Sequence, residues 1–151
     1  MTRPWRDLPA ERRGVVSIEF AMIASGLIML TLGTVEFGRL LWTRQALEAT
    51  AIQVARCVGV LATSCASGGT YNAADTLSYA EQVASGWGVT LSSSAFTISA
   101  NVASGACSGL STAGLSQVTI NYTFQTVIPG VLSMLSGGET LTAQACFPNQ
   151  V

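Results

Sequence analysis

The sequence predicts an α+β fold with one long N-terminal helix, half transmembrane and half amphipathic, a second helix and a small antiparallel sheet of about three strands. Two observations predict it. An apolar run extends from Gly14 to Gly38, and the helical pattern continues to Leu61 without a proline. After residue 95, three stretches alternate apolar and polar residues with period two. A chain of 151 residues has room for one membrane segment and one small domain.

Residues 1–14 are predicted to be a cytoplasmic leader. They are polar and contain two prolines and four arginines. A secretory signal peptide also begins with positive charge, but its apolar region is only about 7 to 15 residues long, and the run here continues for about 24. A retained membrane anchor is therefore the favoured interpretation.

Residues 15–38 are predicted to be a transmembrane helix. About 23 helical residues span roughly 34 Å, which matches a hydrocarbon core of about 30 Å. Glu19 lies near the start of this segment, where a carboxylate facing lipid costs at least a few kcal/mol. Glycines such as Gly26 and Gly33 allow close helix packing, although glycine is also common in membrane helices that have no such partner.

Residues 39–61 are predicted to extend the same helix beyond the membrane, so that residues 15–61 form one helix of about 70 Å. Apolar residues recur there at helical spacing: Phe37, Leu40, Leu47, Ala51, Val54, Val58 and Leu61. Charged and polar residues are expected on the remaining surface: Glu36, Arg39, Arg44, Glu48, Gln53 and Arg56. We expect part of the apolar stripe to pack on the distal domain of the same chain.

Residues 62–151 are predicted to form a small disulfide-containing α+β domain. After a loop of small residues, Asn72 is expected to cap a second helix over residues 73–87. Three strands are expected near residues 96–102, 118–124 and 141–147, with a turn at Pro129 and Gly130 before the last strand. The economical arrangement is an antiparallel sheet folded against the long helix.

The charges are distributed asymmetrically although the net charge is only -1. All seven basic residues are arginines, and none follows Arg56. The distal part therefore lacks cations that would neutralise phosphates, and we do not expect it to bind nucleic acid. Four arginines precede the apolar run, so the positive-inside rule places the N-terminus in the cytoplasm and the C-terminal domain in the periplasm.

The four cysteines, Cys57, Cys65, Cys107 and Cys146, follow the membrane segment, where an oxidising compartment allows disulfides. Four cysteines allow three connectivities. We favour pairing Cys57 with Cys65, which are close in sequence, and Cys107 with Cys146. Their spacing does not resemble a zinc pattern, and the chain has no histidine, so no metal site is expected.

Catalysis is not predicted. Without histidine there is no Ser-His or Cys-His pair, and the distal carboxylates are scattered. We expect neither an enzyme nor a cofactor nor a small-molecule substrate.

Two short motifs carry a family resemblance. The segment Gly14-Val15-Val16-Ser17-Ile18-Glu19-Phe20, directly after Arg12-Arg13, resembles the prepilin peptidase site of the type IV pilin superfamily. The segment Val35-Glu36-Phe37-Gly38-Arg39, followed by Arg44-Gln45-Ala46-Leu47, resembles the TadE-like pseudopilins of Tad (Flp-type, type IVb) pilus systems. A looser resemblance covers residues 116–147.

The resemblance implies a minor pilin or pseudopilin of the inner membrane that takes part in assembly of an adhesion pilus. A prepilin peptidase would cut between Gly14 and Val15, and Glu19 would form an assembly salt bridge with the new amine of a neighbouring subunit. Glu36 and Arg39 would pair at the outer helix boundary. The expected partners are the peptidase, other pilin subunits, the inner-membrane pilus machinery and lipid.

One alternative stays open. The chain would then be an unprocessed single-pass anchor for a periplasmic scaffold or binding domain. In that case Glu19 lies at the membrane interface and pairs with Arg12 or Arg13.

Overall fold

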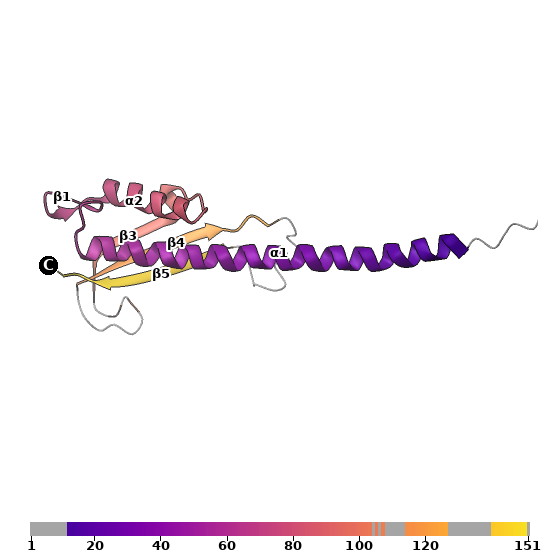
Figure 1. The fold of residues 1–151 in the computed structure, drawn as a ribbon. Helices are drawn as coiled ribbons and strands as arrows, with labels where there is room; N and C mark the ends of the chain where they lie inside the picture. Colours follow the sequence, from indigo (N-terminus) through magenta and orange to yellow (C-terminus); the bar gives the residue numbers. More distant parts are fainter. Residues whose placement is uncertain (1–11, 104, 106, 108–113, 127–139, 151) are drawn as a thin grey trace, which may run out of the picture.

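The computed structural model describes residues 12–103, 105, 107, 114–126 and 140–150. Its elements in chain order are α1 (Arg12–Gly59), β1 (Ala66–Ser67), β2 (Thr70–Tyr71), α2 (Ala73–Gly86), a 3-10 turn η1 (Ser93–Ala95), β3 (Phe96–Val102), β4 (Leu115–Thr123) and β5 (Thr140–Pro148). The C-terminal half of α1 lies along the sheet beside α2, and its N-terminal half projects away (Figure 1). This confirms the α+β prediction. Residues 1–11 of the leader and the turn at Pro129 and Gly130 lie outside the described residues.

Helix α1 runs without interruption for 48 residues. It ends at Gly59, two residues before the expected end at residue 61. Leu61 adopts a φ of 49°, in the left-handed region that closes helices, and the amide of Ala62 donates to the Cys57 carbonyl at 3.0 Å. The apolar spacing predicted too long a helix, because Leu61 continues the helical spacing of apolar residues but lies in the turn after the helix.

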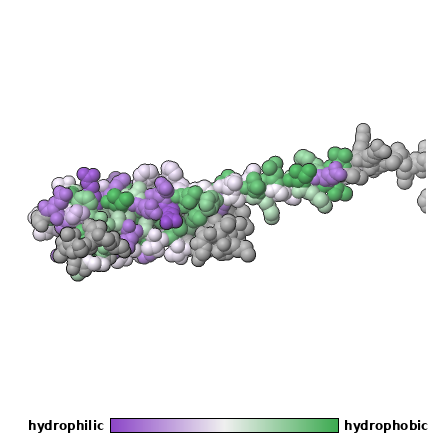
Figure 2. Space-filling model, turned by 90° about the horizontal axis from the view of Figure 1, so that it is seen from below, coloured by the Kyte–Doolittle hydropathy of each residue, from purple (hydrophilic) through white to green (hydrophobic). Residues whose placement is uncertain are grey.

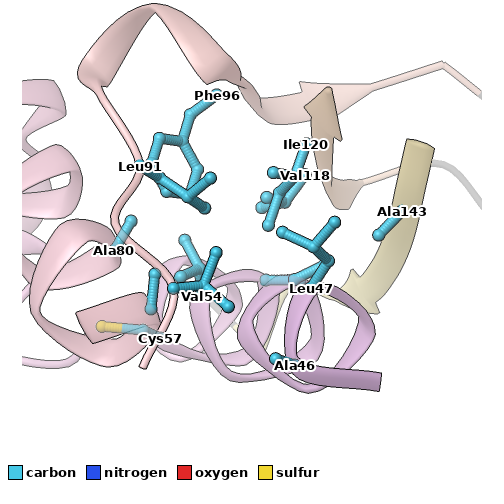
Figure 3. Packing of buried hydrophobic residues seen from close by; sticks show 14 of the residues in the cluster. Ala46, Leu47, Val54, Cys57, Ala80, Leu91, Phe96, Val118, Ile120 and Ala143 are labelled. Atoms are coloured by element: carbon cyan, nitrogen blue, oxygen red, sulfur yellow. The ribbon is translucent and has the colours of Figure 1, made fainter. Parts of the chain in front are cut away.

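The three longer strands form one antiparallel sheet in the order β3-β4-β5. The register places Phe96 opposite Ile120 and Ile120 opposite Ala143, so the apolar positions of all three strands share a face. That face packs on α1, and the labelled side chains point toward one another (Figure 3). Strand β4 begins at Leu115 rather than at residue 118, and it ends just before the buried Phe124.

The core consists of residues from α1, α2 and the sheet. On α1 the fully buried side chains include Leu47, Ala51 and Val54. Two expectations at the start of this stripe were wrong: Phe37 is 46% exposed, whereas Glu36 is only 6% exposed. The buried face runs through Glu36, Leu40, Thr43 and Leu47 at steps of four, three and four residues, and Phe37 lies about 100° around the helix from Glu36.

The segment after α1 contains a small hairpin where the sequence predicted only a loop. Ala66 pairs with Tyr71 and Ser67 with Thr70, and the turn residues Gly68 and Gly69 have φ of 61° and 78°. Two glycines supply the positive φ that a two-residue hairpin turn requires. Asn72 then caps α2, since its side-chain oxygen accepts from the amide of Ala74 at 3.0 Å. Helix α2 ends at Gly86, one residue before the expected end at residue 87.

Candidate processing site and assembly helix

Gly14 lies in the first turn of α1 and is exposed. A Cβ built on it would meet nothing within 4 Å among the described residues. Gly14 therefore presents a stretch of backbone that no described side chain covers.

Glu19 lies two turns into α1 and is exposed. No described residue forms a hydrogen bond or ion pair with its carboxylate. Its neighbours Ile18 and Phe20 are 61% and 71% exposed. A carboxylate on an apolar helix requires a partner or water when the helix enters lipid. Any protein partner of Glu19 in lipid would therefore come from outside the described part of the chain.

The projecting half of α1, residues 14–35, is apolar and contributes no side chain to the core formed by the described residues. The helix is long and apolar enough to cross a membrane, and none of its most apolar window is buried. It appears as a largely green rod beyond the domain (Figure 2). Its exposed large side chains up to residue 35 are Val16, Ile18, Phe20, Met22, Ile23, Leu27, Ile28, Met29, Leu30, Leu32 and Val35. One such helix is compatible with a single-pass membrane anchor.

Three hydroxyl groups of this half are satisfied within the helix itself. Ser25 donates to the Met22 carbonyl at 2.9 Å, and Thr31 donates to the Ile28 carbonyl at 2.9 Å. Thr34 does the same to the Thr31 carbonyl at 2.8 Å. In lipid a polar group has no water to bond, so these internal hydrogen bonds suit the segment to a bilayer.

Glu36 and Arg39 form an ion pair at the point where α1 leaves the domain. Arg39 Nη1 lies 2.9 Å from Glu36 Oε2, and the exposed fractions of the two side chains are 53% and 8%. The guanidinium also lies 5.7 Å from the centre of the Phe124 ring. The pair therefore connects the boundary of α1 to the end of β4, and its geometry favours a structural role. About 26 Å of helix separates it from Glu19.

The disulfides join Cys57 to Cys65 and Cys107 to Cys146, and no described cysteine is free. This is the pairing that the sequence analysis favoured. The first disulfide fixes the turn after α1, and the second attaches Cys107 to β5. Among the described residues, no cluster of three or more acidic, cysteine or histidine side chains could hold a metal ion.

Two tryptophans that the sequence analysis did not connect lie together beside the boundary pair. Trp42 Nε1 donates to the Trp87 carbonyl at 3.2 Å, and the ring centroids are 6.2 Å apart with an interplanar angle of 63°. The sequence offered only their positions as a signal: Trp42 follows the apolar run by four residues, and Trp87 directly follows the second helix.

A comparison with protein families matches residues 14–56 to the family described as TadE-like protein. The match covers the projecting half of α1 and most of its packed half, and it confirms the resemblance found in this part of the sequence. The looser resemblance of residues 116–147 lies outside the match. The comparisons with curated proteins and with solved structures found no match. Similarity to TadE-like proteins suggests involvement in Tad pilus systems, and this family is in general non-enzymatic.

Proposed function

We propose that this chain is a minor pilin or pseudopilin that takes part in assembly of a Tad (Flp-type) adhesion pilus. In this proposal a prepilin peptidase processes it between Gly14 and Val15. The observation that carries the proposal is the placement of Gly14 and Glu19, five residues apart, at the start of an exposed apolar helix that matches the TadE-like family.

The proposed topology is single-pass in the inner membrane. Residues 1–14 lie in the cytoplasm, 15–38 in the bilayer, 39–61 extend the helix, and 62–151 form the periplasmic domain, which becomes extracellular if the subunit enters a pilus. The arginines before the apolar run support this orientation. The two disulfides support an oxidising compartment for the domain.

Cleavage would change the electrostatics of the helix end. It removes the arginines of the leader and gives Val15 a free amine, four residues from Glu19. Either charge alone costs several kcal/mol in the bilayer, and pairing the carboxylate with the amine of a neighbouring subunit offsets both costs. The proposed partners are other pilin subunits, the inner-membrane pilus machinery and the surrounding lipid.

The second candidate is an unprocessed, single-pass periplasmic scaffold or binding protein of the inner membrane. Glu19 would then remain near Arg12 and Arg13 at the cytoplasmic interface. The two candidates differ in whether the leader is removed and in whether Glu19 is required for assembly.

Gly14→Val tests the processing step in cells that carry the matching peptidase. Gly26→Val is the matched control, because a Cβ at either glycine meets nothing within 4 Å in the described structure. We expect the wild-type chain and Gly26→Val to lose the leader on a denaturing gel and Gly14→Val to keep it. Equal cleavage of both variants would refute the proposed site.

Glu19→Gln tests the assembly step separately. We expect this variant to be cleaved but to reduce the yield of sheared pili severely, since the neutral amide leaves the buried amine unpaired. Glu48→Gln is the control, because Glu48 is an exposed glutamate of the same helix that pairs with Arg44 at 3.2 Å. Normal piliation in Glu19→Gln would exclude the salt bridge while leaving the processing result intact.

A further inference from the structure

The end of the domain where α1 emerges carries an exposed aromatic surface. The large apolar side chains there are Phe37, Leu41, Trp42 and Trp87, with exposed fractions of 46%, 46%, 59% and 38%. We call these four residues the aromatic end. Beyond residue 35, the only other exposed large hydrophobic side chains of the described structure are Ile52 and Val60.

The aromatic end lies on the side of α1 that faces away from the sheet. Phe37 and Leu41 lie one turn apart, and Trp42 lies about 100° further around the helix. Trp87 reaches the same place from the end of α2, 45 residues away in sequence. A groove of about 570 Å³ opens beside Trp42, between α1 and the end of β4. The apolar surface thus extends sideways from the helix onto the domain.

The aromatic end lies at the height of a membrane interface if α1 crosses the bilayer. Trp42 is four residues beyond residue 38, which is about 6 Å along the helix. The headgroup region adds roughly 5 to 7 Å on each side of the hydrocarbon core. Trp42 therefore lies in the outer part of this layer, and the Trp87 ring centroid is 6.2 Å from that of Trp42.

Tryptophan favours this layer because its ring is apolar while its N–H requires a polar partner. The N–H of Trp42 already has the Trp87 carbonyl as acceptor, so the Trp42 ring can enter the headgroup layer without leaving that group unsatisfied. In water the same rings leave a contiguous apolar patch exposed, which soluble domains generally avoid.

Charge contributes little to this surface. Arg39 and Arg44 are exposed, but both are paired with glutamates of α1. Arg39 lies 2.9 Å from a carboxylate oxygen of Glu36, and Arg44 lies 3.2 Å from one of Glu48. Each pair is neutral as a whole, so it adds little net attraction for anionic lipid. The surface therefore fits a neutral phospholipid interface as well as a charged one.

We propose that the aromatic end inserts into the outer headgroup layer of the bilayer that α1 crosses, and so fixes the height and tilt of the domain before assembly. The occupant is a phospholipid interface. This inference rests on the proposed single-pass topology, and it implies that extraction into a pilus must remove both indoles from lipid.

The test is depth-dependent quenching of tryptophan fluorescence in the full chain reconstituted in phosphatidylcholine vesicles. Brominated lipids carry the quencher either near the carbonyl end or near the methyl end of the acyl chain. With Trp5→Phe in both, Trp87→Phe reports Trp42 and Trp42→Phe reports Trp87. Both tryptophans are expected to lose more fluorescence to the shallow quencher than to the deep one, with blue-shifted emission and little change when anionic lipid is added.

Two probes in a chain with all three tryptophans replaced by Phe complete the design. Ile52→Trp is the matched control, because Ile52 is 59% exposed on the same helix, as Trp42 is, but lies about 15 Å farther from the membrane. It is expected to be unquenched. Leu27→Trp, in the middle of the apolar segment, is expected to respond most to the deep quencher.

These probes separate the two ways of failing. If Leu27→Trp is quenched while Trp87 is not, the aromatic end does not rest on lipid and the inference is wrong, whereas the membrane topology stands. If Leu27→Trp is not quenched, the topology itself is wrong. A Trp87 signal that changes with the protein-to-lipid ratio would show that a second copy covers this surface, which also overturns the inference.

Discussion

Gly59 joins the end of the long helix to the end of the sheet, and its replacement gives the sharpest test of this packing. A Cβ built at Gly59 would lie 2.6 Å from Phe147 Cδ1 and 3.1 Å from the Pro148 carbonyl oxygen. The Gly59 carbonyl also accepts from the amide of Gln150 at 3.0 Å. Gly59→Ala must therefore push β5 away from α1 or displace a ring that packs on the core.

The expected cost follows from two opposing effects. Overpacking a well-filled site typically costs about 1 to 3 kcal/mol. Replacing glycine by alanine returns up to about 1 kcal/mol of helix propensity, and less at the last residue of a helix. We therefore expect Gly59→Ala to lower the free energy of unfolding by about 1 to 2 kcal/mol.

Gly86→Ala is the matched control for this substitution. Gly86 is likewise the last residue of its helix, but a Cβ there meets nothing within 4 Å in the described structure. Chemical unfolding of the full chain in detergent micelles, followed by near-ultraviolet circular dichroism, measures both variants. We expect Gly86→Ala to be neutral or slightly stabilising. If Gly59→Ala proves as stable as Gly86→Ala, the close contact between α1 and β5 is wrong.

Three further predictions concern the domain. Leu47 is only 1% exposed, so Leu47→Ala should lower the free energy of unfolding by about 2 to 5 kcal/mol. Leu41 is 46% exposed, so Leu41→Ala should lower it by much less. Equal effects of the two variants in chemical unfolding would contradict the packing of Leu47. A disulfide stabilises by the loop-closure entropy that it removes from the unfolded chain, so the longer loop should contribute more. Removing Cys107–Cys146, with a sequence separation of 39, should lower the free energy of unfolding by about 4 kcal/mol, and removing Cys57–Cys65, with a separation of 8, by about 2.5 kcal/mol. The reverse order in unfolding experiments on paired Cys→Ser variants would contradict this model. Burial raises the pKa of Tyr71 above its ordinary value of 10.0, so the domain should lose stability as the pH rises past about 10, and Tyr71→Phe should lessen that loss in an alkaline unfolding series.

Period-two and helical patterns predicted most of the fold, because each strand buries one face and α1 buries one stripe. The inward residues of β3, β4 and β5 align in register as their alternation implied. The same patterns failed where local backbone conformation decides the structure. Leu61 keeps the helical spacing but turns the chain, and Gly68 and Gly69 close a hairpin within a segment that has no apolar alternation.

The candidate site, like the fold, was predictable from the sequence only in part. Gly14, Glu19 and the apolar segment were visible in the sequence because they lie on one continuous helix with regular spacing. The contact between Trp42 and Trp87 was not, since it joins two elements and depends on how α2 packs beside α1. Glu36 was predicted wrongly for another reason. As a charged residue it was expected at the surface, but its position around the helix places it on the buried face.

The most direct test of the central claim is the N-terminal sequence and intact mass of the wild-type protein from membranes of cells that carry the matching prepilin peptidase. We expect a chain that starts at Val15 and, before reduction, lacks four protons because of its two disulfides. A chain in those membranes that still carries residues 1–14 would contradict the processing claim and favour the unprocessed anchor.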